Sequence, residues 1–248
     1  MAAREAKLHF SRFEFKYVMP RGLRDDVEAE LGHFVELDPY VQGQPNQQYF
    51  VRSLYFDDAN HTCFREKVDG MHTRSKFRLR TYTRDPAKPA PSFLEVKGRW
   101  NNLVFKHREL VQEGYDPGAS GYGMSQLIVR HTRASKVRDQ FEFDLYRKQI
   151  RPVVLVDYER RPYVSRFDPH FRLTFDQRLE AGSTDMLFPG PNVTMRQLVP
   201  GYTVMEVKFR HHVPSWFHRI IQAYELRRVS ISKICTGTEA LGLELDPN

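Results

Sequence analysis

The chain has 248 residues, of which 40% are hydrophobic and 13% aromatic, which is enough for a core in one large domain or two small ones. Its net charge of +7 indicates an anionic partner, either nucleic acid, an anionic membrane or a phosphate-rich small molecule, although many mildly basic proteins bind none. The two cysteines, Cys63 and Cys235, lack the spacing of a zinc site, which argues against structural zinc.

Neither a secretion signal nor a membrane span is recognisable. The residues from Met1 to Phe10 lack an apolar signal core, and no apolar run approaches the roughly 20 residues that span a bilayer. Two isolated cysteines favour reduced thiols, and a disulfide between them stays open. We therefore expect a cytoplasmic protein. Peripheral association with a membrane complex, through a membrane-protein companion, is left open, as is the oligomeric state.

Strand-like and helix-like patterns alternate along the chain. The sequence predicts a strand over 10–18, which Pro20 ends, a helix over 21–34, and a strand over 51–56 followed by a helix over 59–68. The remaining expected elements, in chain order, are strands over 75–83, 92–98 and 103–111, helices over 124–130 and 136–148, strands over 153–160, 170–176 and 201–209, and a helix over 214–227.

These eight strands and the helices between them predict an α+β fold in a single domain over residues 1–248. The simplest arrangement is one antiparallel eight-stranded β-barrel, or tunnel, with helices packed on the outside. A barrel of eight strands encloses enough room for a small ligand.

Lysine and arginine recur at every second position in these strands, as in RFEFK at 12–16 and KFRLR at 76–80. Because alternate side chains face opposite sides of a strand, each segment has one charged and one apolar face. A single strand of this kind could be a solvated edge, but seven or eight together favour a sheet curled around a charged interior. The expected charged faces hold Arg12, Glu14, Lys16, Arg52, Lys76, Arg78, Arg80, Tyr82, Glu95, Lys97, Lys106, Arg108, Arg160, Arg172, Asp176, Glu206 and Lys208.

Such a charged interior favours an anionic ligand, because converging cations repel one another when the site is empty. Arginine binds phosphate oxygens with a bidentate fork, and lysine supplies a point charge. The few carboxylates among these cations suit Mg²⁺ or Mn²⁺ shared between protein and phosphates. The interior is therefore suited to a chain of phosphates with a divalent metal.

Other kinds of site find little support in the sequence. No P-loop, dinucleotide-binding or nucleophile-elbow pattern occurs. His211 and His212 are adjacent rather than one helical turn apart, which disfavours a metal role. Tyr82, Trp100 and Tyr163 could stack on a base, but packing in a core or loop is the more ordinary role for each.

The ordered set of short motifs resembles the VTC (vacuolar transporter chaperone) domain over nearly the whole chain. The motifs are RFEFKY at 12–17, SLYFD at 53–57, FRLRTY at 77–82, FLEVK at 93–97, YERRPY at 158–163, RLTFD at 172–176, MEVK at 205–208 and SKI at 232–234. The resemblance implies the fold of the triphosphate tunnel metalloenzymes, a CYTH-like superfamily. The family's characterised catalytic member makes inorganic polyphosphate from ATP inside an antiparallel barrel.

The resemblance also implies roles for single residues. It places phosphate-binding positions at Lys16, Arg78, Arg80, Lys97, Lys106, Arg160 and Arg172, a metal-binding carboxylate at Glu206 and an essential lysine at Lys233. Lys67 falls where the family has an arginine, which keeps the charge and loses the bidentate fork. Arg12 replaces the first glutamate of the Glu-x-Glu-x-Lys pattern of the triphosphatase and cyclase branch, which favours the polymerase-like branch.

Together with the charged faces, these positions give three expected sets of site residues. We expect catalytic roles for Lys233, Arg78, Arg80 and Arg172. We expect phosphate binding by Lys16, Lys67, Lys97, Lys106, Arg108, Arg160 and Lys208. We expect metal coordination by Glu206, Glu14 and Glu95.

The activity that the resemblance implies is metal-dependent transfer of a phosphoryl group from ATP to orthophosphate or polyphosphate, with Mn²⁺ or Mg²⁺ as cofactor and ADP as a product. The triphosphate would lie in the tunnel and the base near its mouth. Two alternatives stay open, a triphosphatase acting on tripolyphosphate or a nucleoside triphosphate, and a non-catalytic polyphosphate-binding module. Nucleic acid is not expected, since no aromatic-plus-basic motif of an RNA-binding sheet is present.

Overall fold

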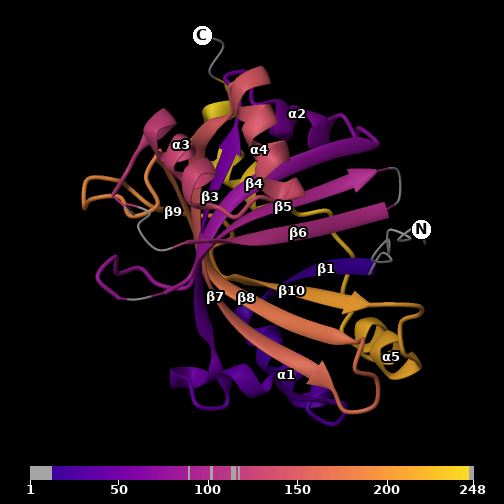
Figure 1. Ribbon diagram of the computed structural model, residues 1–248. Helices are drawn as coiled ribbons and strands as arrows, with labels where there is room; N and C mark the ends of the chain where they lie inside the picture. Colours follow the sequence, from indigo (N-terminus) through magenta and orange to yellow (C-terminus); the bar gives the residue numbers. More distant parts are fainter. Residues whose placement is uncertain (1–12, 89, 101–102, 113–115, 117, 246–248) are drawn as a thin grey trace, which may run out of the picture.

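The protein is built on one antiparallel β-sheet, which is curved so that one face is concave (Figure 1). The computed structural model describes residues 13–88, 90–100, 103–112, 116 and 118–245. Two short strands lie off the main path, since β2 (Val35–Leu37) pairs with β7 and β9 (Arg196–Gln197) pairs with β8. The main path runs in the order β1 (Phe13–Pro20), β10 (Tyr202–Phe209), β8 (Arg172–Ser183), β7 (Arg151–Ser165), β3 (Tyr49–Asp57), β4 (Thr73–Thr81), β5 (Ser92–Trp100) and β6 (Leu103–Val111).

Helices cover both halves of this sheet from outside. Figure 1 shows α3 and α4 against the half that runs from β3 to β6, and α1 and α5 against the half that holds β1, β8 and β10. No helix among the described residues is long and apolar enough to cross a membrane. The α-helices of the described residues are α1 (Arg21–Leu31), α2 (Thr62–Val68), α3 (Gly121–His131), α4 (Lys136–Arg147), α5 (Ser215–Ala223) and α6 (Lys233–Leu241).

Two apolar clusters lie between the outer face of the sheet and these helices. Beneath α1 and α5, the buried residues include Val27, Leu173, Phe175, Met205, Val207, Phe217 and Ile220. Beneath α3 and α4, they include Leu54, Phe77, Leu79, Leu94, Ile128 and Phe141. The prediction that the apolar faces of the strands point outward, against helices, is confirmed for these elements.

Helix α6 does not follow this prediction, because it packs on the inner face of the sheet. Its residues Ile234 and Cys235 belong to a buried cluster with Val154, Val156 and Tyr158, which alternate along β7 on the face that also carries Arg160. On β7, the inner face is charged at Arg160 and apolar toward Val156 and Val154, and α6 covers the apolar part. The sequence predicted no helix over the residues of α6. Cys63 and Cys235 are both free thiols.

The predicted α+β class and antiparallel sheet are confirmed, whereas a closed barrel is not. Among the described pairings, β1 and β6 are the end strands and have no backbone ladder with each other. A salt bridge nevertheless crosses this opening, because Lys97 Nζ of β5 lies 2.9 Å from Glu14 Oε1 of β1. We call the charged space inside the curled sheet the lumen.

Several elements differ in length from their predicted ranges. Strands β7 and β8 extend to 15 and 12 residues. Backbone N–H and C=O groups need hydrogen-bond partners, so the strands stay paired beyond the apolar segments from which the sequence predicts them. Helix α5 ends at Ala223, before the predicted end at 227. The β5–β6 hairpin is confirmed. Residues 10–12 of the first predicted strand, including Arg12, lie outside the described residues.

The Gly237→Leu substitution tests the packing of α6 inside the sheet. A Cβ atom at Gly237 would lie 3.0 Å from Val154 Cγ1 and 3.2 Å from Ala181 Cβ, so a larger side chain has no room. We expect a lower midpoint of thermal unfolding and a loss of about 1–3 kcal/mol, the usual cost of overpacking. The control Glu239→Leu, on the exposed side of the same helix, should change stability by less than about 0.5 kcal/mol. An unchanged midpoint for Gly237→Leu would contradict this position of α6.

Candidate functional site

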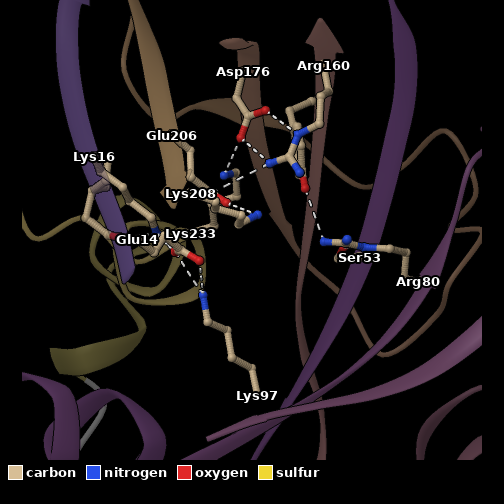
Figure 2. A network of polar contacts seen from close by, with 12 residues as sticks. Glu14, Lys16, Ser53, Arg80, Lys97, Arg160, Asp176, Glu206, Lys208 and Lys233 are labelled. Atoms are coloured by element: carbon tan, nitrogen blue, oxygen red, sulfur yellow. Dashed lines mark hydrogen bonds and ion pairs between the residues drawn. The ribbon is translucent and has the colours of Figure 1, made fainter. Parts of the chain in front are cut away.

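The centre of the lumen is a buried carboxylate held by two cations from different elements. Asp176 of β8 receives both prongs of the Arg160 guanidinium, with Nε–Oδ1 at 2.6 Å and Nη2–Oδ2 at 2.7 Å. Lys233, the first residue of α6, donates to the same Oδ2 at 2.6 Å. Burial favours the neutral acid, but the charges of Arg160 and Lys233 hold the pKa of Asp176 below its ordinary value. Figure 2 shows these three side chains converging.

Glu206 of β10 lies beside this centre. Its carboxylate forms an ion pair with Lys208 two residues along the same strand face, and Arg160 Nη2 lies 3.8 Å from its Oε2. Although Glu206 is buried, these charges hold its pKa well below the ordinary value. Glu206 is therefore an anion at neutral pH, pointing into a space dominated by cations.

A third carboxylate, Glu14 of β1, joins opposite sides of the lumen. Both of its oxygens accept hydrogen bonds of 2.9 Å from Lys97 Nζ of β5, and Lys16 Nζ lies 3.4 Å from Oε1. Burial and Glu206 raise the pKa of Glu14, but Lys97 and Lys16 lower it more, to about 2. Lys16 also donates to the carbonyl oxygen of Ile231 at 2.9 Å, in the segment that leads to α6.

The fourth carboxylate, Glu95 of β5, gathers the cations of β4 and β6. Its side chain is 1% exposed, and Arg78 binds Oε2 through Nε at 2.7 Å and Nη2 at 2.6 Å. Lys106 Nζ lies 2.9 Å from Oε1, and Arg80 Nη1 lies 3.8 Å from Oε2. Despite its burial, these cations hold the pKa of Glu95 far below the ordinary value.

Hydroxyl groups connect the cations around Asp176 with those around Glu95. Arg80 donates to Ser53 Oγ at 3.2 Å and to Tyr158 Oη at 3.1 Å, and Arg78 donates to Tyr55 Oη at 3.1 Å. The Lys233 ammonium lies 4.6 Å from the centre of the Tyr158 ring. Burial alone would raise the pKa of Tyr55, but Arg78 and Arg80 lower it to about 8. In Figure 2, Arg80 and Ser53 lie on the opposite side of the lumen from Lys16.

Two cavities open from opposite ends of the β4–β5 part of the lumen. Cavity 1, of about 430 Å³, is lined by Lys16, Lys67, Lys76 and Lys97 among others. Cavity 2, of about 910 Å³, is lined by aromatic residues and Arg108. Lys76, within β4, lines cavity 1, and Tyr82, the residue after the end of β4, lines cavity 2. Arg78 and Arg80 lie between these two residues, so the cations of β4 separate the two cavities.

Arg172 lies at the margin of this arrangement. It is exposed and pairs in register with Lys208 of β10, on the face of β8 that carries Asp176. It is thus on the predicted face and accessible to an incoming anion, but it is not part of the buried clusters.

The comparisons with known proteins agree with the motifs. The VTC domain family model matches residues 11–242. The chain belongs to the VTC domain family. No significant match was found among curated proteins.

Two solved structures of the Mimivirus capping enzyme triphosphatase resemble this VTC domain weakly. The monoclinic form has a TM-score of 0.32 at 7% identity and covers 86% of this chain and 89% of that one. The triclinic form has a TM-score of 0.25 at 7% identity and covers 83% of this chain and 96% of that one. Similarity at this level supports no argument about activity.

Most of the predicted site residues of the VTC domain meet in the lumen, but one predicted inward residue does not. Arg52 is buried on the outer face of β3, where its guanidinium binds Asp157 at 2.9 and 2.7 Å. The inner face of β3 carries Ser53 and Tyr55 instead. Both faces of β3 are buried, so its sequence lacks the alternation that would have fixed which residues point inward.

The sequence did not reveal four residues as hydrogen-bond partners of the lumen cations. These are Asp176, Ser53, Tyr55 and Tyr158. Asp176 was counted among the lumen acids without a role, although it holds Arg160 and Lys233 together. The pairing of β7 with β8, which places Arg160 opposite Asp176, is a long-range contact that no local pattern reveals.

The carboxylates suit a metal ion that binds together with the substrate phosphates better than a metal ion held by protein ligands alone. Among the described residues, no group of three or more His, Cys, Asp and Glu side chains is arranged to hold a metal ion. Glu95 is enclosed by Arg78, Arg80 and Lys106, so its predicted metal role is disfavoured. Glu206 faces the lumen next to Asp176 and Glu14, and one carboxylate plus phosphate oxygens is a usual Mg²⁺ site.

The Asp176→Asn substitution should destabilise the empty protein. Without this charge, Arg160 and Lys233 would face each other in a buried space, and breaking a buried pair costs about 3–5 kcal/mol. Tripolyphosphate should restore part of that loss by supplying anionic oxygens. Thermal unfolding with and without tripolyphosphate measures both effects.

The matched control for this experiment is Asp144→Asn on α4, a buried carboxylate that binds Gln140 and Lys148 outside the lumen. Its instability should not respond to tripolyphosphate beyond the response of the native protein. Equal recovery of both variants would contradict a lumen that exchanges carboxylate for phosphate.

Binding of a polyanion near pH 8 should take up protons. Burial lowers the pKa of Lys97 to about 8 and, with Arg78 nearby, that of Lys106 to about 7. At pH 8 both lysines are therefore partly neutral, and a bound polyanion raises each pKa by favouring the charged form. At pH 6 both are already charged, so the uptake should vanish.

Calorimetric titration with long-chain polyphosphate, in buffers of different ionisation enthalpy, measures the protons taken up. Internal phosphates of a long chain have no proton to release at these pH values. The double variant Lys97→Met, Lys106→Met should lose most of the uptake, whereas Lys136→Met, at the exposed start of α4, should keep it. Uptake that is the same at pH 6 and pH 8 would contradict this assignment.

Proposed function

We propose that this VTC domain transfers the γ-phosphoryl group of ATP to orthophosphate or to the end of a polyphosphate chain, making inorganic polyphosphate and ADP. Membership in the VTC domain family supports chemistry on phosphates in general. The finer choice of a polymerase rests on the lumen itself.

The observation that carries the proposal is the surplus of positive charge that lines the lumen. Eight lysine and arginine side chains converge on four carboxylates, which are Glu14, Glu95, Asp176 and Glu206. A linear polyanion can replace the carboxylates as the partner of each cation along the lumen. A cavity lies near each end of this row of cations, where such a chain would enter and leave.

Transfer to phosphate needs few acids or bases from the protein. A phosphate acceptor is already anionic at neutral pH, so no general base is required to activate it. The protein's contribution is to hold donor and acceptor in line and to stabilise the charge that spreads over the transferred group. Arg78, Arg80, Arg160 and Lys233 are fixed by hydrogen bonds before substrate binds, which lowers the cost of reorganisation during the reaction.

Glu206 is the residue best placed to share a divalent cation, Mn²⁺ or Mg²⁺, with the phosphates. Such a cation, when bound, would offset the negative charge of the phosphate groups. Lys208 and Arg160 then have phosphate oxygens as alternative partners in place of Glu206.

A triphosphatase is the second candidate, because the cations of the same lumen would also suit tripolyphosphate or a nucleoside triphosphate. Hydrolysis requires an activated water, which favours more carboxylates free to coordinate metal or accept a proton. Each of the four lumen carboxylates is instead engaged by cations. This engagement favours transfer and retention of a polyanionic product over release of phosphate.

Incubating the purified protein with ATP and Mn²⁺ or Mg²⁺ separates the candidates. We expect ADP together with a ladder of polyphosphate resolved by length. ADP with an equal amount of free phosphate would support the triphosphatase. Tight triphosphate binding without turnover would leave only a binding module.

The Arg172→Ala substitution tests the role of the lumen in that assay. Arg172 is exposed, so its loss should leave the unfolding temperature unchanged, while removal of one phosphate-directed charge should lower kcat/KM by about 10²-fold. Arg78→Ala should lower activity at least as much, and also stability, because Glu95 Oε2 loses two hydrogen-bond donors. Arg147→Ala, exposed at the end of α4, is the control. Full activity in Arg172→Ala and Arg78→Ala would refute the assignment.

A further inference from the structure

A group of exposed aromatic side chains lies on the outer side of α4 and on the adjoining helix α3. Phe143 and Tyr146 of α4 are both 56% exposed, and Tyr122 of α3 is 50% exposed. Tyr122 lies next to Tyr146, whose pKa it raises by charge repulsion and through a hydrogen bond. Single exposed rings need no explanation, but three that adjoin one another form an apolar patch of the kind that marks an interface.

This patch is not the side of α4 that holds the helix on its own sheet. The opposite side carries Val137, Phe141 and Leu145, which are buried in the cluster beneath α3 and α4. A surface helix of a globular protein needs one apolar stripe, which faces the core. Helix α4 has a second one, at Phe143 and Tyr146, that faces away from the core and indicates a partner outside the chain.

Two opposite charges flank this second stripe at equal distances. Asp139 lies four residues before Phe143, and Arg147 lies four residues after it, so each is about 6 Å from Phe143 along the helix axis and near the same face. Both charged residues are exposed. The Asp139 side chain is 64% exposed even though Arg138 Nη2 lies 3.2 Å from its Oδ1, so its carboxylate has room for a second cation.

The arrangement is complementary to itself after a rotation of half a turn. When two copies of α4 pack antiparallel with their Phe143 rings at the two-fold axis, Asp139 of each copy lies opposite Arg147 of the other copy. A two-fold interface contains every contact twice, because residue i of one copy meets residue j of the other and the reverse. Both ion pairs then surround a central aromatic contact, as in interfaces with a polar rim and an apolar centre.

Other kinds of partner match the patch less well. Asp139 and Glu142 lie on the same helix as the exposed rings, and these acids oppose binding to an anionic membrane or to nucleic acid. A second copy of the chain instead supplies a cation for Asp139 and an acid for Arg147.

We infer that this protein forms a symmetric dimer through antiparallel pairing of α4 with α4 of a second copy, held by Phe143, Tyr146 and the Asp139–Arg147 ion pairs. This pairing does not depend on the proposed function. Helices α3 and α4 lie on the outer side of the sheet (Figure 1), and neither contributes to the described lining of cavity 1 or cavity 2. A small interface of this kind gives a weak dimer, so association depends on protein concentration.

Exchanging the charges between two variants tests this geometry, with association measured by sedimentation velocity over a range of protein concentrations. In Asp139→Arg, each ion pair becomes a contact between two cations, and in Arg147→Asp it becomes a contact between two acids. Each variant alone should associate at least about 10-fold more weakly than the native protein, because like charges oppose docking. An equimolar mixture should recover native association, since every contact in the mixed dimer again joins one cation to one acid.

The aromatic centre of the interface is tested by Phe143→Ser. This variant should stay monomeric over concentrations at which the native protein associates, as expected for a central ring of an interface. The matched control is Phe167→Ser, which removes a phenylalanine that is 72% exposed in the turn between β7 and β8 and should leave association unchanged.

Thermal unfolding of each variant, expected at the native midpoint because all of these positions are exposed, separates a loss of association from a loss of folding. Native protein that stays monomeric at every concentration would overturn the inference. It would also be overturned by a mixture of the two charge variants that associates no better than either one alone, or by equal effects of Phe143→Ser and Phe167→Ser.

Discussion

The mutual repulsion of cations in a buried space is the constraint on which this structure depends. Arg160 and Lys233 approach the same oxygen of Asp176, and Arg78, Arg80 and Lys106 approach Glu95. Each carboxylate lies where two or more cations would otherwise repel one another at low effective dielectric constant. The four carboxylates therefore keep the empty sheet curled, while too few are present to neutralise it fully.

This incomplete neutralisation links folding to ligand binding. A fully neutral lumen would gain little from a polyanion, and a lumen without carboxylates would not fold around its cations. In this partly neutralised lumen, the guanidinium groups of Arg78 and Arg80 are already oriented by Ser53, Tyr55 and Tyr158. Phosphate oxygens can therefore replace carboxylates with little movement. The low pKa values of the carboxylates express the same balance, because each acid is held ionised by cations that a ligand would share.

The sequence predicted this balance well where a strand has one charged and one apolar face. The spacing of Glu14 with Lys16, Arg78 with Arg80 and Glu206 with Lys208 follows directly from the two-residue period of a strand. The prediction was wrong for Arg52, since β3 is buried on both faces and an arginine there pairs outward with Asp157. The roles of Asp176 and Tyr158 depend on partners that are distant in sequence. The family resemblance, rather than periodicity, pointed to Lys233.

Helix α6 explains how a distant residue reaches the centre of the lumen. The inner face of β7 changes along the strand from Arg160 and Tyr158 to Val156 and Val154, and the apolar part needs a cover. Ile234 and Cys235 supply it, with Gly237 allowing close approach. Because Lys233 begins this helix, apolar packing alone brings its ammonium to Asp176, at the boundary between the apolar and charged parts of the face. One helix therefore covers the apolar part of the inner face and contributes a cation to the site.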